Sequence, residues 1–350
     1  MAQKPLPTAD LDYILSNTSS HWEEMRDQRI FITGGTGFFG CWLLESFLHI
    51  NRQLRLNASA TVLTRDYAAF ALKCPHVATD PALIFVTGDV RSFDFPCGDF
   101  HYVIHAATEA SARQAAEQPL EMLTTVIDGT ARILNFARTH ATRKLLLTSS
   151  GAVYGKQPHN LSHIPEEYLG GPDPLDPASV YGEGKRVSEQ MCALEAKRSH
   201  CEIKIARCFA FVGPGLPLNT HFAIGNFIAD ALAGRTIQIK GDGTARRSYL
   251  YAAELAIWLW TILFRAPSLV PVNVGSAQDL SILELAREVV RSLDRSTNIQ
   301  VALEPAPGVP AARYVPSVAR ANQLLGLEQT VNLQEAICRT AAWHVEGDEI

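Results

Sequence analysis

The sequence has no long hydrophobic run and no excess of charge of either sign. Its longest apolar run, Leu255–Phe264, is about half of the length that a transmembrane helix needs, so we expect a buried helix there and no membrane span. The 31 Lys and Arg nearly balance the 36 Asp and Glu, and the net charge is −5. This balance gives no electrostatic basis for binding nucleic acid or an anionic membrane, and we expect neither partner.

The sequence also lacks paired cysteine motifs and a secretory signal. Its seven cysteines are an odd number without any C-x-x-C pair. The first residues include Asp10, Asp12, Glu23 and Glu24 and have no apolar core of the kind that a signal peptide carries. These features predict reduced thiols and a cytoplasmic protein. No group of His, Cys, Asp and Glu has the spacing of a metal site, so we expect no metal.

What the chain does contain is a regular alternation of short apolar strands and helices. With 350 residues, 47% hydrophobic and 19% charged, it is typical of a globular protein of about two domains. We predict strands at Arg29–Thr33, Ala60–Leu63, Leu83–Val86, Tyr102–His105 and Lys144–Thr148, and helices at Gly40–Ile50, 120–140, 222–233, 252–265, 281–294 and 332–344. Continuous apolar strands that alternate with helices predict a doubly wound parallel sheet, the α/β Rossmann class. We expect a helical extension at 1–27, the doubly wound domain at 28–205, and a smaller, partly interleaved lobe at 206–350.

Three glycines join the first predicted strand to the first helix. Gly34, Gly37 and Gly40 are spaced G-x-x-G-x-x-G. The first permits a tight turn, the second lets a pyrophosphate approach the backbone, and the third lets the helix pack on the sheet with its N-terminus facing the anion. Since a strand precedes the motif and a helix follows it, the motif predicts a dinucleotide site. Thr36, Phe38 and Phe39 lie on the same turn and are further candidates for cofactor contacts.

The end of the second strand bears on which dinucleotide is bound. An acidic residue there would bind the ribose 2′-hydroxyl of NAD. If Thr64 holds that position, Arg65 is placed to meet a 2′-phosphate, which favours NADP; if the register shifts by two, Asp66 restores NAD. We slightly favour NADP. Asp89, followed by Val90, is placed either to accept a hydrogen bond from the adenine amino group or to stabilise a turn.

Tyr181 and Lys185 are four residues apart, so on a helix both side chains lie on one face. An ammonium beside a phenol lowers the phenol's pKa and favours a tyrosinate, which is a usable general base near neutral pH. Ser150 follows another strand, where its hydroxyl can hydrogen-bond the substrate oxygen that loses or gains the proton.

With these residues in place, the chain resembles the extended short-chain dehydrogenase/reductases that act on nucleotide sugars, the epimerase/dehydratase group. The matching stretches are TGGTGFFG (33–40), GDV (88–90), HAAT (105–108), TSSGAVYG (148–155), YGEGK (181–185), GNFI (225–228), GDGTARRSYLY (241–251), NVGS (273–276) and RYVPSVARANQLLG (313–326). They cover roughly residues 27–345.

The resemblance implies roles for individual residues. It implies Ser150, Tyr181 and Lys185 as the catalytic triad, with Tyr181 and Lys185 also contacting the cofactor. Other cofactor contacts would be Gly34, Gly37, Gly40, Asp89, Ala106 and Ala107, and the substrate diphosphate would lie near Asn226, Arg247 and Arg313. Two arginines suit a diphosphate because a guanidinium pairs bidentately with phosphate oxygens. The family also implies a homodimer formed through two helices of each subunit.

The chain departs from the family pattern at four positions. Dehydratases and nucleotide-sugar decarboxylases usually carry an acidic residue where this chain has Ala152, and 4,6-elimination then lacks its general acid. Thr125 and Ala210 replace asparagines, and Ser317 stands where an aspartate is frequent. However, YGEGKR and GNFI are close to the decarboxylases' versions of these motifs.

We therefore expect an NAD(P)-dependent enzyme that transfers hydride at C4 of a nucleotide-linked sugar, as a 4-epimerase or 4-ketoreductase. The alternatives are a UDP-glucuronate decarboxylase, a nucleotide-sugar 4,6-dehydratase, or a non-enzymatic NAD(P)-binding sensor. His105 is expected to be a buried framework residue. Glu109 and His221 are lesser candidates for contacts with the sugar and the nucleotide base.

Overall fold

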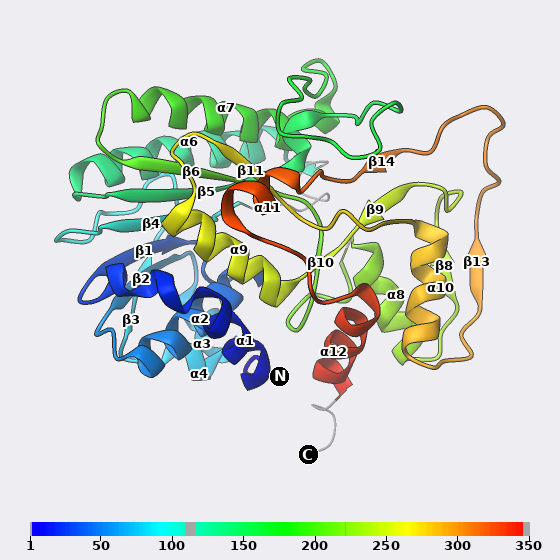
Figure 1. Cartoon of the computed structure of the whole chain (residues 1–350), viewed down its shortest axis with the longest axis horizontal. Helices are drawn as coiled ribbons and strands as arrows, with labels where there is room; N and C mark the ends of the chain where they lie inside the picture. Colours follow the sequence, from blue (N-terminus) through cyan, green and yellow to red (C-terminus); the bar gives the residue numbers. More distant parts are fainter. Residues whose placement is uncertain (1, 109–116, 221, 346–350) are drawn as a thin grey trace.

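The computed structural model describes residues 2–108, 117–220 and 222–345, and a seven-stranded parallel sheet lies at its centre (Figure 1). In spatial order the strands are β11 (Pro271–Val274), β6 (Glu202–Cys208), β5 (Lys144–Ser150), β4 (Tyr102–His105), β1 (Arg29–Thr33), β2 (Ser59–Thr64) and β3 (Leu83–Thr87). The chain runs outward from β1 to β3, then returns to β4 on the other side of β1. In such a sheet the ligand crevice lies at the carboxyl ends of the strands where the order reverses, here between β1 and β4. The predicted doubly wound α/β class is confirmed.

Helices cover both faces of this sheet (Figure 1). One face carries α6 (Pro119–Thr139) and α7 (Val180–Ala196), and the other carries α2 (Phe38–Leu54) and α9 (Ala252–Arg265). All residues of α9 from Ala252 to Phe264 are buried, because the helix packs on β5 and β6 and is itself covered by α1 (Thr8–Thr18) and η1 (Ser19–Met25). The prediction of a buried helix in this apolar run is confirmed.

The predicted boundaries differ from the observed ones by a few residues. The helix expected to begin at Gly40 begins at Phe38, directly after the N-cap Gly37, and continues to Leu54, where Arg55 adopts a left-handed conformation (φ +50°). The helix expected at 120–140 is α6. Sequence analysis did not propose the two short helices between β2 and β3, namely α3 (Tyr67–Lys73) and α4 (Pro75–Ala78).

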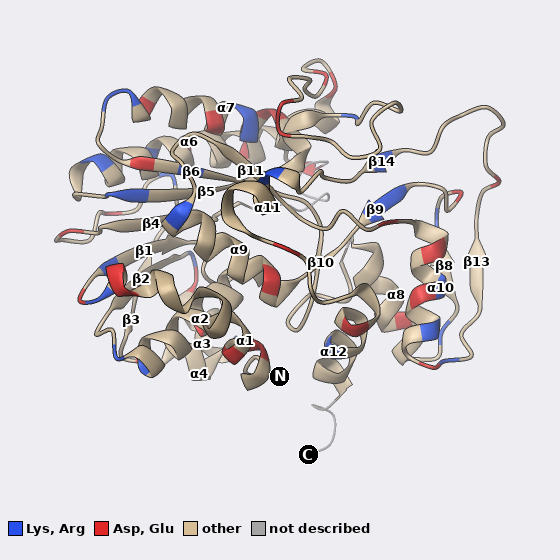
Figure 2. Ribbon diagram, viewed as in Figure 1, with Lys and Arg blue, Asp and Glu red and all other residues tan. Residues whose placement is uncertain are grey.

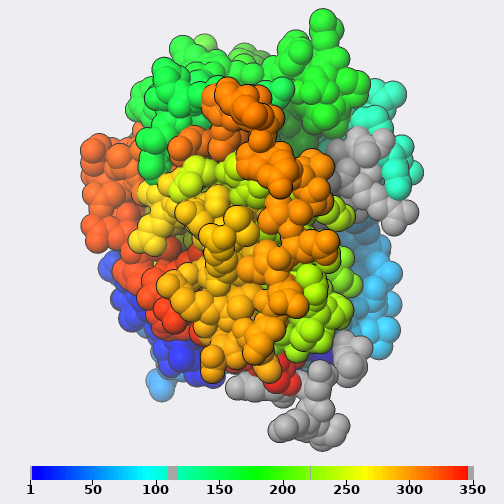
Figure 3. All heavy atoms as spheres, turned by 90° about the vertical axis from the view of Figure 1, so that its right-hand side faces the viewer, coloured from blue at the N-terminus to red at the C-terminus, as the bar shows by residue number. Residues whose placement is uncertain are grey.

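The C-terminal part of the chain forms a smaller lobe beside the carboxyl ends of the strands (Figures 1 and 3). Its elements are β7 (Phe211–Val212), α8 (Ala223–Leu232), β8 (Ile237–Ile239), β9 (Arg246–Ser248), β10 (Leu250–Tyr251), β12 (Asp279–Ser281), α10 (Ile282–Ser292), β13 (Ile299–Val301), β14 (Arg313–Tyr314) and α12 (Leu333–Val345). A three-stranded sheet, β12-β9-β14, faces the main sheet's crevice side. Two short 3-10 turns, η2 (Gly151–Tyr154) and η3 (Pro177–Ser179), and α11 (Ala319–Leu325) complete the described elements.

The N-terminal segment joins the two parts of the molecule. Trp22 is fully buried, with its ring 4.7 Å from that of Trp260 on α9. The buried carboxylate of Asp10 accepts hydrogen bonds from Tyr251 Oη (2.6 Å) and from Arg339 of α12 (2.6 Å). The segment therefore contacts both the C-terminal helix and the helical layer of α2 and α9, which lies on the face of the sheet opposite α6 and α7.

Lys and Arg are interspersed with Asp and Glu over both lobes (Figure 2). All seven cysteines are unpaired. Within residues 2–108, 117–220 and 222–345, no helix combines the length and the apolar character that crossing a membrane requires.

Candidate functional site

The glycine turn between β1 and α2 is shaped by contacts that only glycine allows. Gly34 has φ +72°, and a Cβ on it would overlap the carbonyl of Ala106, while a Cβ on Gly40 would overlap the backbone of Gly34 and Gly35. A Cβ on Gly37, by contrast, would meet nothing closer than 3.5 Å. Gly37 is the N-cap of the 17-residue α2 and provides no side-chain cap. The outer side of the turn therefore remains open to an anion, at a helix N-terminus whose first N–H groups lack side-chain partners.

The other residues predicted to contact a dinucleotide lie around this turn. Ala106 and Ala107 follow β4 and are held against β1, where Ala107 N donates to Thr33 Oγ1 (3.1 Å). Phe39 packs edge-on against Phe211, with ring centroids 5.0 Å apart. Thr36 lies on the turn itself, and Phe38 is the first residue of α2. The turn, the helix end and these backbone contacts fit the pyrophosphate of a dinucleotide, and they are the residues that would hold it.

The acidic residues that follow β2 and β3 each accept hydrogen bonds from a residue close to them in the chain. Asp66 caps α3, where its Oδ1 accepts from Ala69 N (2.8 Å). Both carboxylate oxygens of Asp89 accept from Arg91 (2.8 Å each), and the Arg91 guanidinium, with a smaller effect from Arg65, lowers the pKa of Asp89. Asp66 is thus committed to a helix cap. Whether Arg65 meets a 2′-phosphate or Asp66 binds a ribose hydroxyl stays a prediction.

The structure brings the three predicted catalytic residues together. Ser150 ends β5, while Tyr181 and Lys185 lie in the first half of α7, with Lys185 Nζ 5.9 Å from the centre of the Tyr181 ring. Lys185 is buried, and its Nζ donates to Thr108 Oγ1 (2.7 Å) and to the Thr148 carbonyl (2.8 Å). Burial lowers the pKa of Lys185 to about 8.

The expected lowering of the Tyr181 pKa is wrong for the structure as described. Burial raises the pKa of Tyr181, and the neighbouring phenol of Tyr314 raises it further, while a hydrogen bond with Ser150 opposes the shift. The physical reason is that Lys185 directs its ammonium to Thr108 and Thr148, and desolvation of the phenolate outweighs the remaining attraction.

The predicted diphosphate residues come from three elements of the C-terminal lobe. Arg247 lies on β9, which is hydrogen-bonded to β14, and in the register of these two strands Arg313 stands opposite Arg246. Asn226 lies on α8. Arg313 Nη1 is 3.1 Å from Asp279 Oδ2, and Arg246 pairs with the same carboxylate. Arg247 donates to the Arg246 carbonyl (2.8 Å), and its guanidinium lies 5.8 Å from the Tyr314 ring centre. Arg313 is therefore partly neutralised, whereas no carboxylate partner is found for Arg247 among the described residues.

Several residues around the triad were not singled out from the sequence. Thr108, in the HAAT stretch, anchors Lys185, and Tyr314 shares Ser150 with Tyr181. Beneath the triad, Arg207 forms a bidentate ion pair with Glu189 (2.7 Å), which also accepts from Ser149. The positions of these residues depend on contacts between distant segments, for which the sequence carries no periodic signal.

His105 is a framework residue, as expected. Its Nδ1 shares a hydrogen bond with Thr33 Oγ1 (2.9 Å), and its Nε2 lies 3.3 Å from Thr130 Oγ1, which contacts Ser188 Oγ (2.8 Å). Burial lowers the pKa of His105 to about 3, so the ring is neutral at physiological pH. Glu109 and His221 lie outside the described residues. In the described part of the chain, no group of three or more His, Cys, Asp or Glu residues could hold a metal ion.

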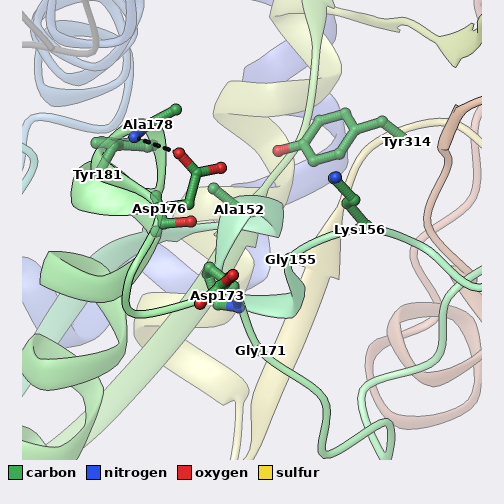
Figure 4. Close-up of a pocket in the computed structure, with 12 residues that line it drawn as sticks. Ala152, Gly155, Lys156, Gly171, Asp173, Asp176, Ala178, Tyr181 and Tyr314 are labelled. Carbon is green, nitrogen blue, oxygen red and sulfur yellow. Dashed lines mark hydrogen bonds between the residues drawn. The ribbon is translucent and has the colours of Figure 1, made fainter. Parts of the chain in front are cut away.

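A cavity of about 550 Å³ opens in front of Tyr181 (Figure 4). Its lining residues are Ala152, Gly155, Lys156, Gly171, Pro172, Asp173, Asp176, Ala178, Ser179, Tyr181, Gly182 and Tyr314. Asp173 and Asp176 each accept from a backbone N–H of their own loop, Leu175 N (2.9 Å) and Ala178 N (3.0 Å). Figure 4 shows the Tyr314 hydroxyl and the Lys156 ammonium directed into the same space. The cavity is large enough for a sugar, and Tyr181 is one of its lining residues.

Comparison with known proteins agrees with this geometry. The model of the NAD dependent epimerase/dehydratase family matches residues 30–275. A UDP-glucuronic acid decarboxylase 1 of Xenopus tropicalis is 31% identical over 89% of this chain and 71% of its own. Among solved structures, a UDP-glucose 4-epimerase of Thermotoga maritima with UDP-glucose superposes with a TM-score of 0.76 (19% identity, 92% of this chain and all of the other). A dTDP-glucose 4,6-dehydratase of Streptomyces venezuelae solved with NAD gives 0.77 (22% identity, 91% and 98%). These two likenesses concern the fold.

Proposed function

Because the chain belongs to the NAD-dependent epimerase/dehydratase family, we propose that it oxidises a UDP-linked hexuronate at C4, releases C6 as CO2 and reduces the resulting 4-keto pentose. The observation that carries this proposal is the 31% identity with a UDP-glucuronic acid decarboxylase over 89% of the chain. The likeness favours the decarboxylase alternative over the 4-epimerase or 4-ketoreductase that the sequence motifs first suggested. The family description names NAD; the preference for NADP stays a prediction.

The triad supplies the acid–base chemistry for oxidation at C4. Bound NAD would accept the C4 hydride and later return it. Tyr181 takes the proton of the C4 hydroxyl, Ser150 donates a hydrogen bond to the C4 oxygen, and the Lys185 ammonium favours the phenolate once the sugar and cofactor have displaced water. A proton at Tyr181 Oη is then available when the C4 oxygen must be protonated again.

Loss of CO2 places few demands on additional residues. In a 4-keto hexuronate the carboxylate is β to the ketone, so the C5–C6 bond breaks with its electron pair delocalised onto the C4 oxygen, which Tyr181 and Ser150 already hold. The resulting enolate takes a proton from solvent at C5, which gives the 4-keto pentose that is then reduced. Dehydration, in contrast, needs an acid to expel a hydroxyl from C6, and this wall of the cavity carries Ala152. Lys156 lines the same cavity, and its ammonium supports a substrate that carries a carboxylate.

Epimerisation or 4-keto reduction at C4 is the second candidate, and Ala152 favours it over decarboxylation, because decarboxylases usually carry an acidic residue at that position. Both reactions use the same triad and need no acid toward C6. A sensor that binds NAD(P) without chemistry is the third reading, and the assembled triad argues against it.

The decisive experiment offers UDP-glucuronate, UDP-glucose and a 4-keto nucleotide sugar to the purified protein, and identifies the products by NMR while CO2 is measured. We expect one CO2 for each UDP-pentose formed, without net consumption of added reduced cofactor. A 4-epimeric hexose or hexuronate without CO2 would replace decarboxylation by epimerisation. Consumption of reduced nicotinamide would indicate a ketoreductase, and no reaction with any of the sugars would favour the sensor.

Replacement of Tyr181 by Phe removes the proposed base while keeping the ring. We expect kcat to fall by about 10²–10⁴-fold, as is typical of a lost general acid–base residue. Cofactor affinity, measured by fluorescence titration, should change little. Tyr168→Phe, a tyrosine in the same region that has no place in the mechanism, serves as the control. Full activity of Tyr181→Phe would remove the assignment of the base.

A further inference from the structure

A second phenol lies at the catalytic serine. Tyr314, on β14 of the C-terminal lobe, lines the same cavity as Tyr181, and its hydroxyl points into that cavity (Figure 4). A Cβ built on Gly151, the residue after Ser150, would lie 2.8 Å from Tyr314 Oη. The hydroxyl thus touches the turn that carries the catalytic serine, although the two residues belong to different lobes.

The position of Tyr314 is fixed by its backbone neighbours. Val315 N donates to the buried Gln157 Oε1 (2.9 Å), Pro316 forms a β-bridge with Ile164, and Asn273 Nδ2 donates to the Ser317 carbonyl (3.0 Å). These contacts bind both sides of the 314–317 segment to the loop after η2 and to β11. A side chain held in this way is preorganised rather than free to swing through the cavity.

Small residues after the serine make room for the ring. A Cβ on Gly151 would lie 2.6 Å from Phe209 Cζ as well as close to Tyr314 Oη, and Ala152 adds only a methyl group. The rings of Phe209 and Tyr314 pack with centroids 4.7 Å apart, and Arg247 lies on the other side of Tyr314. Gly151 is therefore the residue that allows the second phenol to approach Ser150.

Ser150 has a single proton to offer to its neighbours. Its Oγ accepts from Ala152 N (3.1 Å), and it acts as a hydrogen-bonding partner of both phenols. We propose that Tyr314 is a positioning residue for the C4 oxidation: its hydroxyl donates to Ser150 Oγ, so that the single proton of Ser150 is directed to the phenolate of Tyr181 before proton transfer and to the C4 oxygen after it. The proposal rests on the proposed oxidation at C4, but not on decarboxylation.

The ionisation state of Tyr314 suits this role. Burial raises its pKa to about 12, so it keeps its proton at physiological pH and acts as a donor. The other ionisable groups facing the two phenols are Cys208 on β6, Lys185 on α7, Arg247 on β9, and Lys156, Asp173 and Asp176 at the cavity wall. A chain of donors from Tyr314 through Ser150 stabilises the charged form of Tyr181 and therefore lowers the pKa at which it becomes a base.

Tyr314→Phe tests this role because it removes the hydroxyl and keeps the ring. The readout is the single-turnover appearance of reduced nicotinamide with the nucleotide sugar that the wild type oxidises, followed from pH 6 to 10. We expect the rate at pH 7 to fall about tenfold and the rising limb to move about one pH unit higher, since one unit of pKa corresponds to a factor of ten. The variant should approach the wild-type rate at high pH. An unchanged profile, or an equal loss at every pH, would overturn the proposal.

A double-mutant cycle separates action through Ser150 from a structural effect. In a Ser150→Ala background, Tyr314→Phe should change the rate by less than about twofold, because its partner is gone. An undiminished tenfold loss would show that Tyr314 acts elsewhere. Tyr168→Phe, another tyrosine that contacts the η2 region, is the matched control and should leave the pH profile unchanged.

A crystal structure of the NAD-bound protein gives a readout independent of turnover. Hydrogen-bond distances, roughly 2.5–3.0 Å, from Ser150 Oγ to both phenols would support the proposal, together with a rotated Ser150 in Tyr314→Phe. If Tyr314 Oη is more than about 4 Å from Ser150 Oγ, the proposal fails. Absence of reduced nicotinamide with every sugar would instead count against the proposed C4 oxidation.

Discussion

At the scale of single residues, burial determines the pKa values of the groups in the site, whereas sequence motifs indicate only which groups are present. The spacing of Tyr181 and Lys185 marked them as candidates, the family resemblance implied that they form a triad with Ser150, and the structure brings the three together. The predicted direction of the Tyr181 pKa shift was wrong. Lys185 donates to Thr108 Oγ1 and to the Thr148 carbonyl, and these partners cannot be inferred from the spacing of Tyr181 and Lys185. Side-chain partners from distant segments are the part that sequence reasoning misses.

Because His105 is buried in its neutral form, we expect a measurable loss of folding stability in acid. Its pKa is about 3 in the fold, against an ordinary value of 6.5, so below pH 6.5 the unfolded chain binds a proton that the folded chain does not. The stabilisation is therefore present above pH 6.5 and is lost as the pH falls toward 3. We expect His105 to account for about 2 kcal/mol of lost unfolding free energy between pH 6.5 and pH 5.

Urea unfolding at the two pH values measures this effect. The same comparison in His105→Asn, which cannot titrate, isolates the contribution of the histidine from that of the carboxylates. An equally large acid loss in the variant would assign the effect to other groups.

We expect Arg65 to favour NADP over NAD as the cofactor. The nearby acidic groups are engaged, Asp66 in capping α3 and Asp89 in pairing with Arg91. Replacing Arg65 by Ala should weaken NADP binding by at least tenfold and change NAD binding by less than about threefold, since a guanidinium contributes most to a phosphate. Parallel titrations with both nucleotides measure this. Equal losses would show that Arg65 does not read a 2′-phosphate.

At the scale of elements, the local pattern predicted five of the seven strands of the main sheet, but not β6 and β11, nor the short strands of the smaller lobe. The predicted strands of the doubly wound domain lie within two residues of the observed ones, because each is a continuous apolar segment bounded by polar or glycine residues. β9 and β14 have only two or three residues each and carry arginines. Strands so short are defined by their partners, so their pairing, and with it the placement of Tyr314, could not be predicted from sequence.

The glycine turn yields a prediction that separates folding from binding. Gly37→Ala adds a Cβ with nothing closer than 3.5 Å, so the unfolding free energy should change by less than about 1 kcal/mol. NAD binding should nevertheless weaken by at least tenfold, because the methyl group occupies the open side of the cradle. Gly34→Ala, which meets the Ala106 carbonyl and a left-handed φ, should lose more than about 2 kcal/mol of stability. Unchanged NAD affinity in Gly37→Ala would place the pyrophosphate elsewhere.

At the scale of the whole molecule, the N-terminal segment and the C-terminal helix α12 contact each other on a side of the molecule away from the cavity. The N-terminal segment was expected to form a helical extension, without a predicted place of contact. It packs on α2 and α9 and is bound through Asp10 to Arg339 of α12. The face of α6 and α7 on the opposite side of the sheet is left uncovered by this segment (Figure 1).

That uncovered face carries the last prediction, the homodimer expected from the family. Leu120 on α6 is 76% exposed and Leu194 on α7 is 54% exposed, and Leu134, Met191 and Leu194 line a groove between the two helices. Two copies that pair these helices would bury the apolar side chains, whereas a charge placed there would remain unpaired in the interface. Leu194→Glu should therefore convert a dimer into a monomer, measured by light scattering after size-exclusion chromatography. The control is Leu72→Glu, at an apolar residue of α3 that is 79% exposed. A wild-type monomer, or a dimer unaffected by Leu194→Glu, would exclude this face as the subunit contact.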